Sequence, residues 1–240
     1  MAVNPLPDPL AGVAAAPAVD PRAGLFDIVI EFVGVWSEPL RSAFLAAAER
    51  IEAVVLNDLP DVAAPSADGS LMTVDDLLIR AELPAMDGVG GALGIAVPTL
   101  LRADSLLPVT AQMRFDADDA ASLDARCAWD DIVLHEMLHC LGFGTLWAAK
   151  GLVAADGGYV GAAGMAAYAA IGGAGPVPLE TEGGVGTARL HWSEAVFGAE
   201  LMTGWIGDES HLRPLTVASL SDLGYGLAPR GVWAVDAAYA

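Results

Sequence analysis

The strongest constraint on this chain is a short stretch in which two histidines stand four residues apart. The stretch is WDDIVLHEMLHCLGFGTLW, residues 129–147. On an α-helix, positions four apart lie above one another on one face, so the imidazoles of His135 and His139 can hold one zinc ion. Glu136 leaves the helix beside them, where it can reach a zinc-bound water, and Gly142 is a natural helix stop. The alternative is a helix with two buried, hydrogen-bonded histidines.

Composition argues against two classes of partner. The chain has 240 residues, of which 55% are hydrophobic, enough for one large domain or one domain in two lobes. Its formal net charge is −20, from 11 basic and 31 acidic residues. Nucleic acids and anionic membranes both require basic patches, so neither is an expected partner. No apolar run is long enough to predict a transmembrane segment.

The cysteines and the N-terminal residues predict neither a disulfide scaffold nor a signal peptide. Cys127 and Cys140 flank the expected helix and so lie about 20 Å apart, whereas a disulfide needs Cα atoms within about 7 Å. We therefore expect free thiols. Residues 1–23 are rich in proline and alanine and lack a basic segment followed by an apolar run. They are predicted to form a disordered tail and not a cleavable signal peptide.

Hydrophobic patterns predict a mixture of strands and helices. Alternation predicts strands over residues 26–33, 77–83, 92–97 and 109–115. Helical spacing predicts helices over residues 37–54, 129–141, 165–171 and 215–223. Pro98 should end the third strand, and Gly224 should end the last helix. Residues 59–70 are expected to form a loop, and the Gly- and Ala-rich residues 151–190 a mostly irregular segment.

Three aspartates crowd the end of the fourth expected strand. Asp116, Asp118 and Asp119 place three carboxylates within four positions. Such a cluster can hold a calcium ion. A solvated turn is the favoured interpretation, because aspartate is common in turns without any ion.

A catalytic zinc usually takes three protein ligands, so the helix needs one more from elsewhere in the chain. His191 is favoured, since a glycine-rich stretch before it allows the chain to return to the helix. The other downstream candidates are His211, Glu180, Glu182, Glu194 and Glu200.

With the glycine included, the helix motif is HExxHxxG, which resembles the zinc motif of the metzincins. In that motif a third histidine follows the glycine by three residues, but Thr145 occupies this position. In this respect the chain resembles the leishmanolysin-like branch of the metzincins, in which a long insertion separates the glycine from the third histidine. In this chain the insertion would be residues 143–190. Two later segments also resemble that branch, HWSEAVFGAELMTG and PLTVASLSDLGY. The resemblance covers residues 25–228.

The resemblance implies a zincin-like α+β fold: a twisted, mostly parallel sheet with an antiparallel edge strand, an active-site helix and an irregular C-terminal lobe. Residues 24–240 would form one metallopeptidase domain, with lobes at 24–148 and 149–240. The implied activity is a zinc-dependent endopeptidase acting on a protein or peptide substrate. In the implied site, the zinc ligands are His135, His139 and His191. Glu136 would be the general base and then the general acid, and Met202 would be the methionine of a Met-turn.

Two alternatives remain at this point. One is a zinc hydrolase in which a carboxylate replaces His191 as the third ligand. The other is a non-catalytic acidic binding or surface protein that keeps zinc for stability. Glu136 disfavours the second alternative, since a purely structural zinc site needs no general base.

Overall fold

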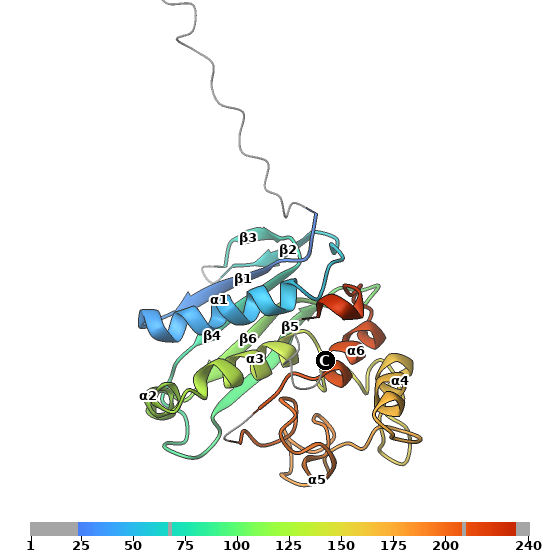
Figure 1. Cartoon of the computed structure of the whole chain (residues 1–240). Coiled ribbons are helices and arrows are strands. Elements are labelled where there is room, and N and C mark those ends of the chain that lie inside the picture. Colours follow the sequence, from blue (N-terminus) through green and yellow to red (C-terminus); the bar gives the residue numbers. More distant parts are fainter. Residues whose placement is uncertain (1–23, 67–68, 208–209, 234–240) are drawn as a thin grey trace, which may run out of the picture.

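Four strands form the central sheet of the computed structural model, which describes residues 24–66, 69–207 and 210–233 (Figure 1). Across the sheet, the order is β1 (Ile28–Val33), β4 (Leu77–Glu82), β6 (Pro108–Phe115) and β5 (Gly94–Leu101). β1, β4 and β6 are parallel, and β5 runs antiparallel beside β6 at the edge. The prediction of an α+β chain with a mostly parallel sheet and an antiparallel edge strand is confirmed. The predicted disordered tail lies outside the described residues.

Helices α1 (Glu38–Glu52) and α3 (Trp129–Cys140) cover one face of the sheet (Figure 1). Phe44, from the buried stripe of α1, contacts Phe115 on β6 and the ring of Trp129, with ring centroids 5.6 and 6.3 Å apart. Trp129 Nε1 also donates to the Leu40 carbonyl at 3.0 Å. Aromatic side chains therefore hold the start of α3 between α1 and the sheet.

The opposite face carries a two-stranded hairpin that the sequence did not predict. Its strands are β2 (Val62–Pro65) and β3 (Leu71–Val74), so the predicted loop over residues 59–70 is wrong in its central part. A second hydrophobic cluster lies beneath the hairpin and comprises Ala64, Val74, Leu78 and Val109. Two alanines and a proline among the four residues of β2 disfavour a strand, so pairing and burial decide its conformation.

Strand β5 is longer than predicted. It runs through Pro98 to Leu101, although proline was expected to end it. Proline lacks an N–H and is tolerated in strands at edges and bulges. Pro98 satisfies both conditions, because β5 is an edge strand and its pairing with β6 shifts register between Pro98 and Leu100.

The prediction of a solvated turn at the three aspartates after β6 is wrong. They begin a helix, α2 (Ala117–Ala125), in which Asp116 is the N-cap and accepts the Asp118 N–H at 2.9 Å. The second oxygen of Asp116 accepts the N–H groups of Asp87 and Gly88, at 3.0 and 2.9 Å. Aspartate is favoured both in turns and at helix N-caps, so the residue type alone did not distinguish them.

After α3, the chain forms short elements joined by loops: α4 (Ala162–Ala170), α5 (Glu194–Phe197), α6 (Pro214–Leu223) and the 3₁₀ helix η1 (Arg230–Val232). α4 overlaps the helix predicted over residues 165–171. α6 matches its prediction and ends at Gly224, whose φ of 110° is left-handed. Asp222 of α6 accepts the N–H groups of Ala163 and Gly164 at 2.9 Å, which fixes α4 on α6.

Both cysteines are free thiols, as predicted; Cys127 is exposed and Cys140 is buried. The main hydrophobic cluster extends from Phe26 to Tyr225 and so contains residues from both expected lobes. Within the described part of the chain, no helix combines the length and the apolar character that a bilayer span requires.

Candidate metal centre

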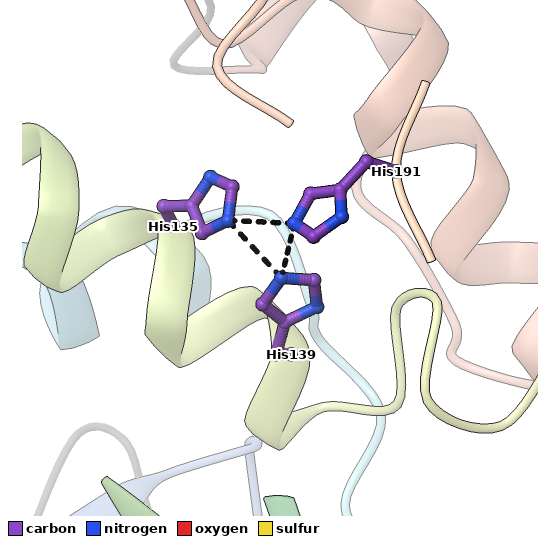
Figure 2. A group of neighbouring side chains, drawn as sticks. All are labelled: His135, His139 and His191. Atoms are coloured by element: carbon purple, nitrogen blue, oxygen red, sulfur yellow. Dashed lines mark hydrogen bonds between the residues drawn. The ribbon is translucent and has the colours of Figure 1, made fainter. Parts of the chain in front are cut away.

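The three histidines expected to form one site meet at one point (Figure 2). His135 and His139 extend from successive turns of α3, and His191 comes from the segment between α4 and α5. Their Nε2 atoms form a nearly equilateral triangle with sides of 3.1, 3.1 and 3.0 Å. All three side chains are buried, with 5–7% of each residue exposed. We call this group the histidine triad.

The outer nitrogen of each triad imidazole faces a backbone carbonyl. The partners of His135, His139 and His191 Nδ1 are the carbonyl oxygens of Leu201, Phe143 and Thr187, at 2.8, 2.9 and 2.9 Å. A carbonyl only accepts hydrogen bonds, so each Nδ1 carries the proton. In neutral imidazoles the three Nε2 atoms then present lone pairs to one another. Three converging lone pairs repel, and a cation between them removes the repulsion.

The ionisation of the triad suits a metal ligand set. Burial, together with the smaller effect of the neighbouring His191, lowers the pKa of His135 to about 3. Burial likewise lowers the pKa of His139 and of His191. The imidazoles are therefore uncharged at neutral pH, which is the form that binds a metal. Tetrahedral zinc at its usual bond length would separate ligand nitrogens by about 3.3 Å, close to the observed triangle.

Glu136 lies beside the triad in a confined position. It is 8% exposed, and burial raises the pKa of its carboxyl group to about 8. A nearby cation opposes such a shift and favours the ionised carboxylate that a general base requires. Its side chain lies against β5, where a Cβ built on Gly94 would come within 2.9 Å of Glu136 Oε1. The glycine therefore makes room for the carboxyl group at the sheet edge.

The end of α3 positions His139 through a sharp reversal of the chain. Gly142, predicted to stop the helix, has a φ of +104°. The reversal brings the Phe143 carbonyl back to His139 Nδ1. Thr145, at the position of the third histidine in the compact motif, instead donates its hydroxyl to the His139 carbonyl at 3.1 Å. This threonine therefore caps the helix that carries the first two histidines.

An aromatic cluster holds the His191 segment against the end of α3. Trp192 is fully buried, and its ring centroid lies 4.9, 5.2 and 5.1 Å from those of Trp147, Phe143 and Tyr159. Its neighbour His191 is consequently fixed relative to α3, although the two are far apart in the sequence. Buried aromatic rings share a large contact area in a specific geometry, and this packing restrains the position of the segment.

Close backbone packing at Gly144 leads to a prediction about His191. Gly144 has a φ of +67°, and a Cβ there would lie 2.1 Å from the Leu190 carbonyl oxygen. We expect Gly144→Ala to push away the segment that carries His191 and to weaken zinc binding at least about tenfold, as loss of ligand support does. Gly151→Ala is the matched control, since Gly151 has a φ of +68° but nothing within 4 Å of its Cβ position. Titration against a chelating dye compares the two variants, and equal affinities would contradict the prediction.

The downstream carboxylates considered as third ligands lie elsewhere. Within the described residues, no carboxylate oxygen lies within 4.8 Å of all three ligand nitrogens of the triad. Glu180 accepts the N–H groups of Thr181, Glu182 and Glu194, which lower its pKa despite the opposing effect of burial. Glu200 is 1% exposed and accepts from Thr216 and Met202. Glu180 and Glu200 thus act as hydrogen-bond acceptors within the protein. The sequence did not reveal this role, because a glutamate that accepts hydrogen bonds and a glutamate that binds a metal look the same in a sequence.

The predicted Met-turn lies directly beside the triad. Met202 is fully buried, and the carbonyl of the preceding Leu201 is the partner of His135. The Met202 N–H donates to Glu200 at 2.6 Å, and its carbonyl accepts the Trp192 N–H at 2.9 Å. The turn is therefore fixed on both sides.

A second acidic group lies far along the chain from the triad. Asp27, Asp75 and Asp76 bring carboxylate oxygens within 4.8 Å of one another. Asp76 is buried and accepts the N–H groups of Asp27 and Leu59, at 2.7 and 2.6 Å. These bonds tie the start of β1 to the loop before β2.

Comparison with known proteins adds no identification. No protein-family model matches this chain, and no curated protein matches it either.

Proposed function

We infer that this chain is a zinc-dependent endopeptidase with a zincin-like fold of the leishmanolysin-like type. The observation that carries the inference is the convergence of three buried, uncharged imidazole nitrogens whose outer N–H groups are all hydrogen-bonded. The donor set suits a catalytic zinc, which uses three protein ligands and leaves one position open. Glu136 beside this set distinguishes it from a structural zinc site, which normally has four protein ligands.

The residues around the triad divide the chemistry of peptide hydrolysis between them. A zinc ion, when bound, would polarise the scissile carbonyl and acidify a water. Glu136 would accept the proton of the attacking water on a carboxylate oxygen and pass it to the leaving amine nitrogen, acting as general base and then general acid. Only 8% of Glu136 is exposed, which limits the access of bulk water to this transfer.

The edge of the sheet supplies a surface for an extended substrate. Among the described residues, no strand pairs with the outer edge of β5. A peptide can add there as a further strand through backbone hydrogen bonds. Ile95 and Val97 are 45% and 43% exposed and would contact substrate side chains. Gly94, at the start of β5, lies against Glu136, so such a peptide would pass close to the general base.

Metal analysis combined with a cleavage assay tests this function. The purified full chain is expected to contain one zinc per molecule and to cleave members of a quenched fluorescent peptide library. A chelator should abolish cleavage, and added zinc should restore it. Stoichiometric zinc without cleavage of any peptide would instead favour the non-catalytic alternative.

Metal removal should also destabilise the protein, because the empty triad keeps its lone pairs in mutual repulsion. With free zinc about 1,000-fold above the dissociation constant, binding adds about 4 kcal/mol to the free energy of unfolding. We expect the melting temperature to fall when zinc is chelated and to recover when zinc is returned. The His135→Ala/His139→Ala double variant is the control, and a chelator should leave its melting temperature unchanged. An identical response of both proteins would argue against zinc binding at the triad.

A further inference from the structure

A buried hydrogen-bond network joins α6 to both sides of the triad. Trp192 Nε1 donates to Thr216 Oγ1 at 2.8 Å, and the Thr216 hydroxyl donates to Glu200 Oε1. The other carboxylate oxygen, Glu200 Oε2, accepts the Met202 N–H at 2.6 Å. All four residues are at most 1% exposed. One carboxylate thus receives hydrogen bonds from α6 and from the turn after α5.

The two oxygens of Glu200 lead to different histidines. Through Thr216, Oε1 holds the indole of Trp192, the residue that follows His191. Through Met202, Oε2 holds the turn whose Leu201 carbonyl accepts the His135 Nδ1–H. The remaining histidine, His139, has its carbonyl partner in the reversal at the end of α3 and not in this hydrogen-bond network.

A buried carboxylate is costly unless its oxygens are hydrogen-bonded, and both oxygens of Glu200 are. We propose that Glu200 is a positioning residue that sets the placement of His135 and His191 relative to each other. It does so by joining the Leu201 turn and the Trp192 indole to a single carboxylate. The proposal rests on the metal site proposed above and adds a residue outside the ligand set, which acts only through its neighbours.

Two substitutions at this position separate hydrogen bonding from mere volume. Glu200→Ala removes both acceptors and should lower zinc affinity about 10- to 100-fold, the range for partners that orient metal ligands. Glu200→Gln should restore most of that affinity. Its carbonyl oxygen can accept the Met202 N–H while its amide donates to the Thr216 hydroxyl, which has two acceptor sites. Thr216→Val breaks only the branch to His191 and should cause a smaller loss.

A spectroscopic measurement identifies the histidines affected. In the zinc-loaded protein each triad ring keeps one Nδ1–H proton, which is visible in the downfield region of the proton NMR spectrum. Glu200→Ala should shift or broaden the resonances of His135 and His191 and leave that of His139 in place. A general loosening of the structure would alter all three resonances.

The controls separate this role from stability. Val74→Ala destabilises the second hydrophobic cluster, and Ser221→Ala removes a hydroxyl of α6 that bonds only within its own helix, at 2.9 Å to Ala218 O. Both should keep wild-type zinc affinity. If Glu200→Ala has wild-type zinc affinity and the three resonances are unchanged, the role of Glu200 is overturned and the metal site is not. A wild-type protein that binds no zinc would overturn the metal site, and the proposal with it. If Glu200→Ala does not fold, Thr216→Val and Glu200→Gln decide.

Discussion

Glu136→Gln should abolish peptide cleavage while the protein keeps its zinc. The substitution preserves the shape of the side chain beside Gly94 but removes its capacity to accept a proton. General acid and base catalysis by one side chain contributes about 10²- to 10⁴-fold, so kcat should fall by at least that range. The triad is untouched, and zinc content and melting temperature should therefore equal those of the wild type. Steady-state cleavage of a fluorogenic peptide, with metal analysis of the same sample, measures both quantities.

The matched control for this variant is Glu182→Gln, the same change at an exposed position. It should keep full activity. Undiminished proteolysis by Glu136→Gln would exclude Glu136 as the general base. Loss of zinc from the variant would indicate a ligand role for Glu136 in place of the catalytic one.

His191→Ala should remove the metal. Without this imidazole, zinc is left with two nitrogens on one helix, and the affinity should fall well beyond the roughly 100-fold typical of lost support around a ligand. We expect zinc content to drop from one per chain to near zero after dialysis. Activity and the stabilisation by zinc should be lost together.

His211→Ala is the matched control, because His211 is the remaining histidine of the chain and does not belong to the group of converging imidazoles. Its backbone pairs with Ala199 and Leu201, and alanine keeps both of these bonds. This variant should retain one zinc per chain. Stoichiometric zinc in His191→Ala would contradict the assignment and favour the alternative in which a carboxylate completes the site.

Patterns that act over a few residues were the most predictable part of the fold. The i, i+4 spacing of His135 and His139 depends only on helical geometry. The strands of the central sheet follow the alternation of apolar residues, and Gly142 and Gly224 end their helices with left-handed φ angles. The errors occurred where tertiary contacts outweigh local preference. The β2–β3 hairpin is stabilised by burial against the sheet, and the aspartates after β6 begin α2 instead of a turn.

The sequence by itself determined the paired imidazoles, the carboxyl group between them and the helix stop, because backbone geometry places residues so close in the chain. It also supplied a short set of candidates for the third ligand, with His191 favoured by the glycine-rich stretch before it and by resemblance. Only the tertiary structure decided which candidate meets the helix and which carboxylate supports it. His191 is 52 residues beyond His139 and reaches it through the aromatic packing of Trp192 and the cramped contact at Gly144. Glu200 faces Thr216 instead of the triad. Contacts across such separations depend on the packing of the whole core, which no local pattern encodes.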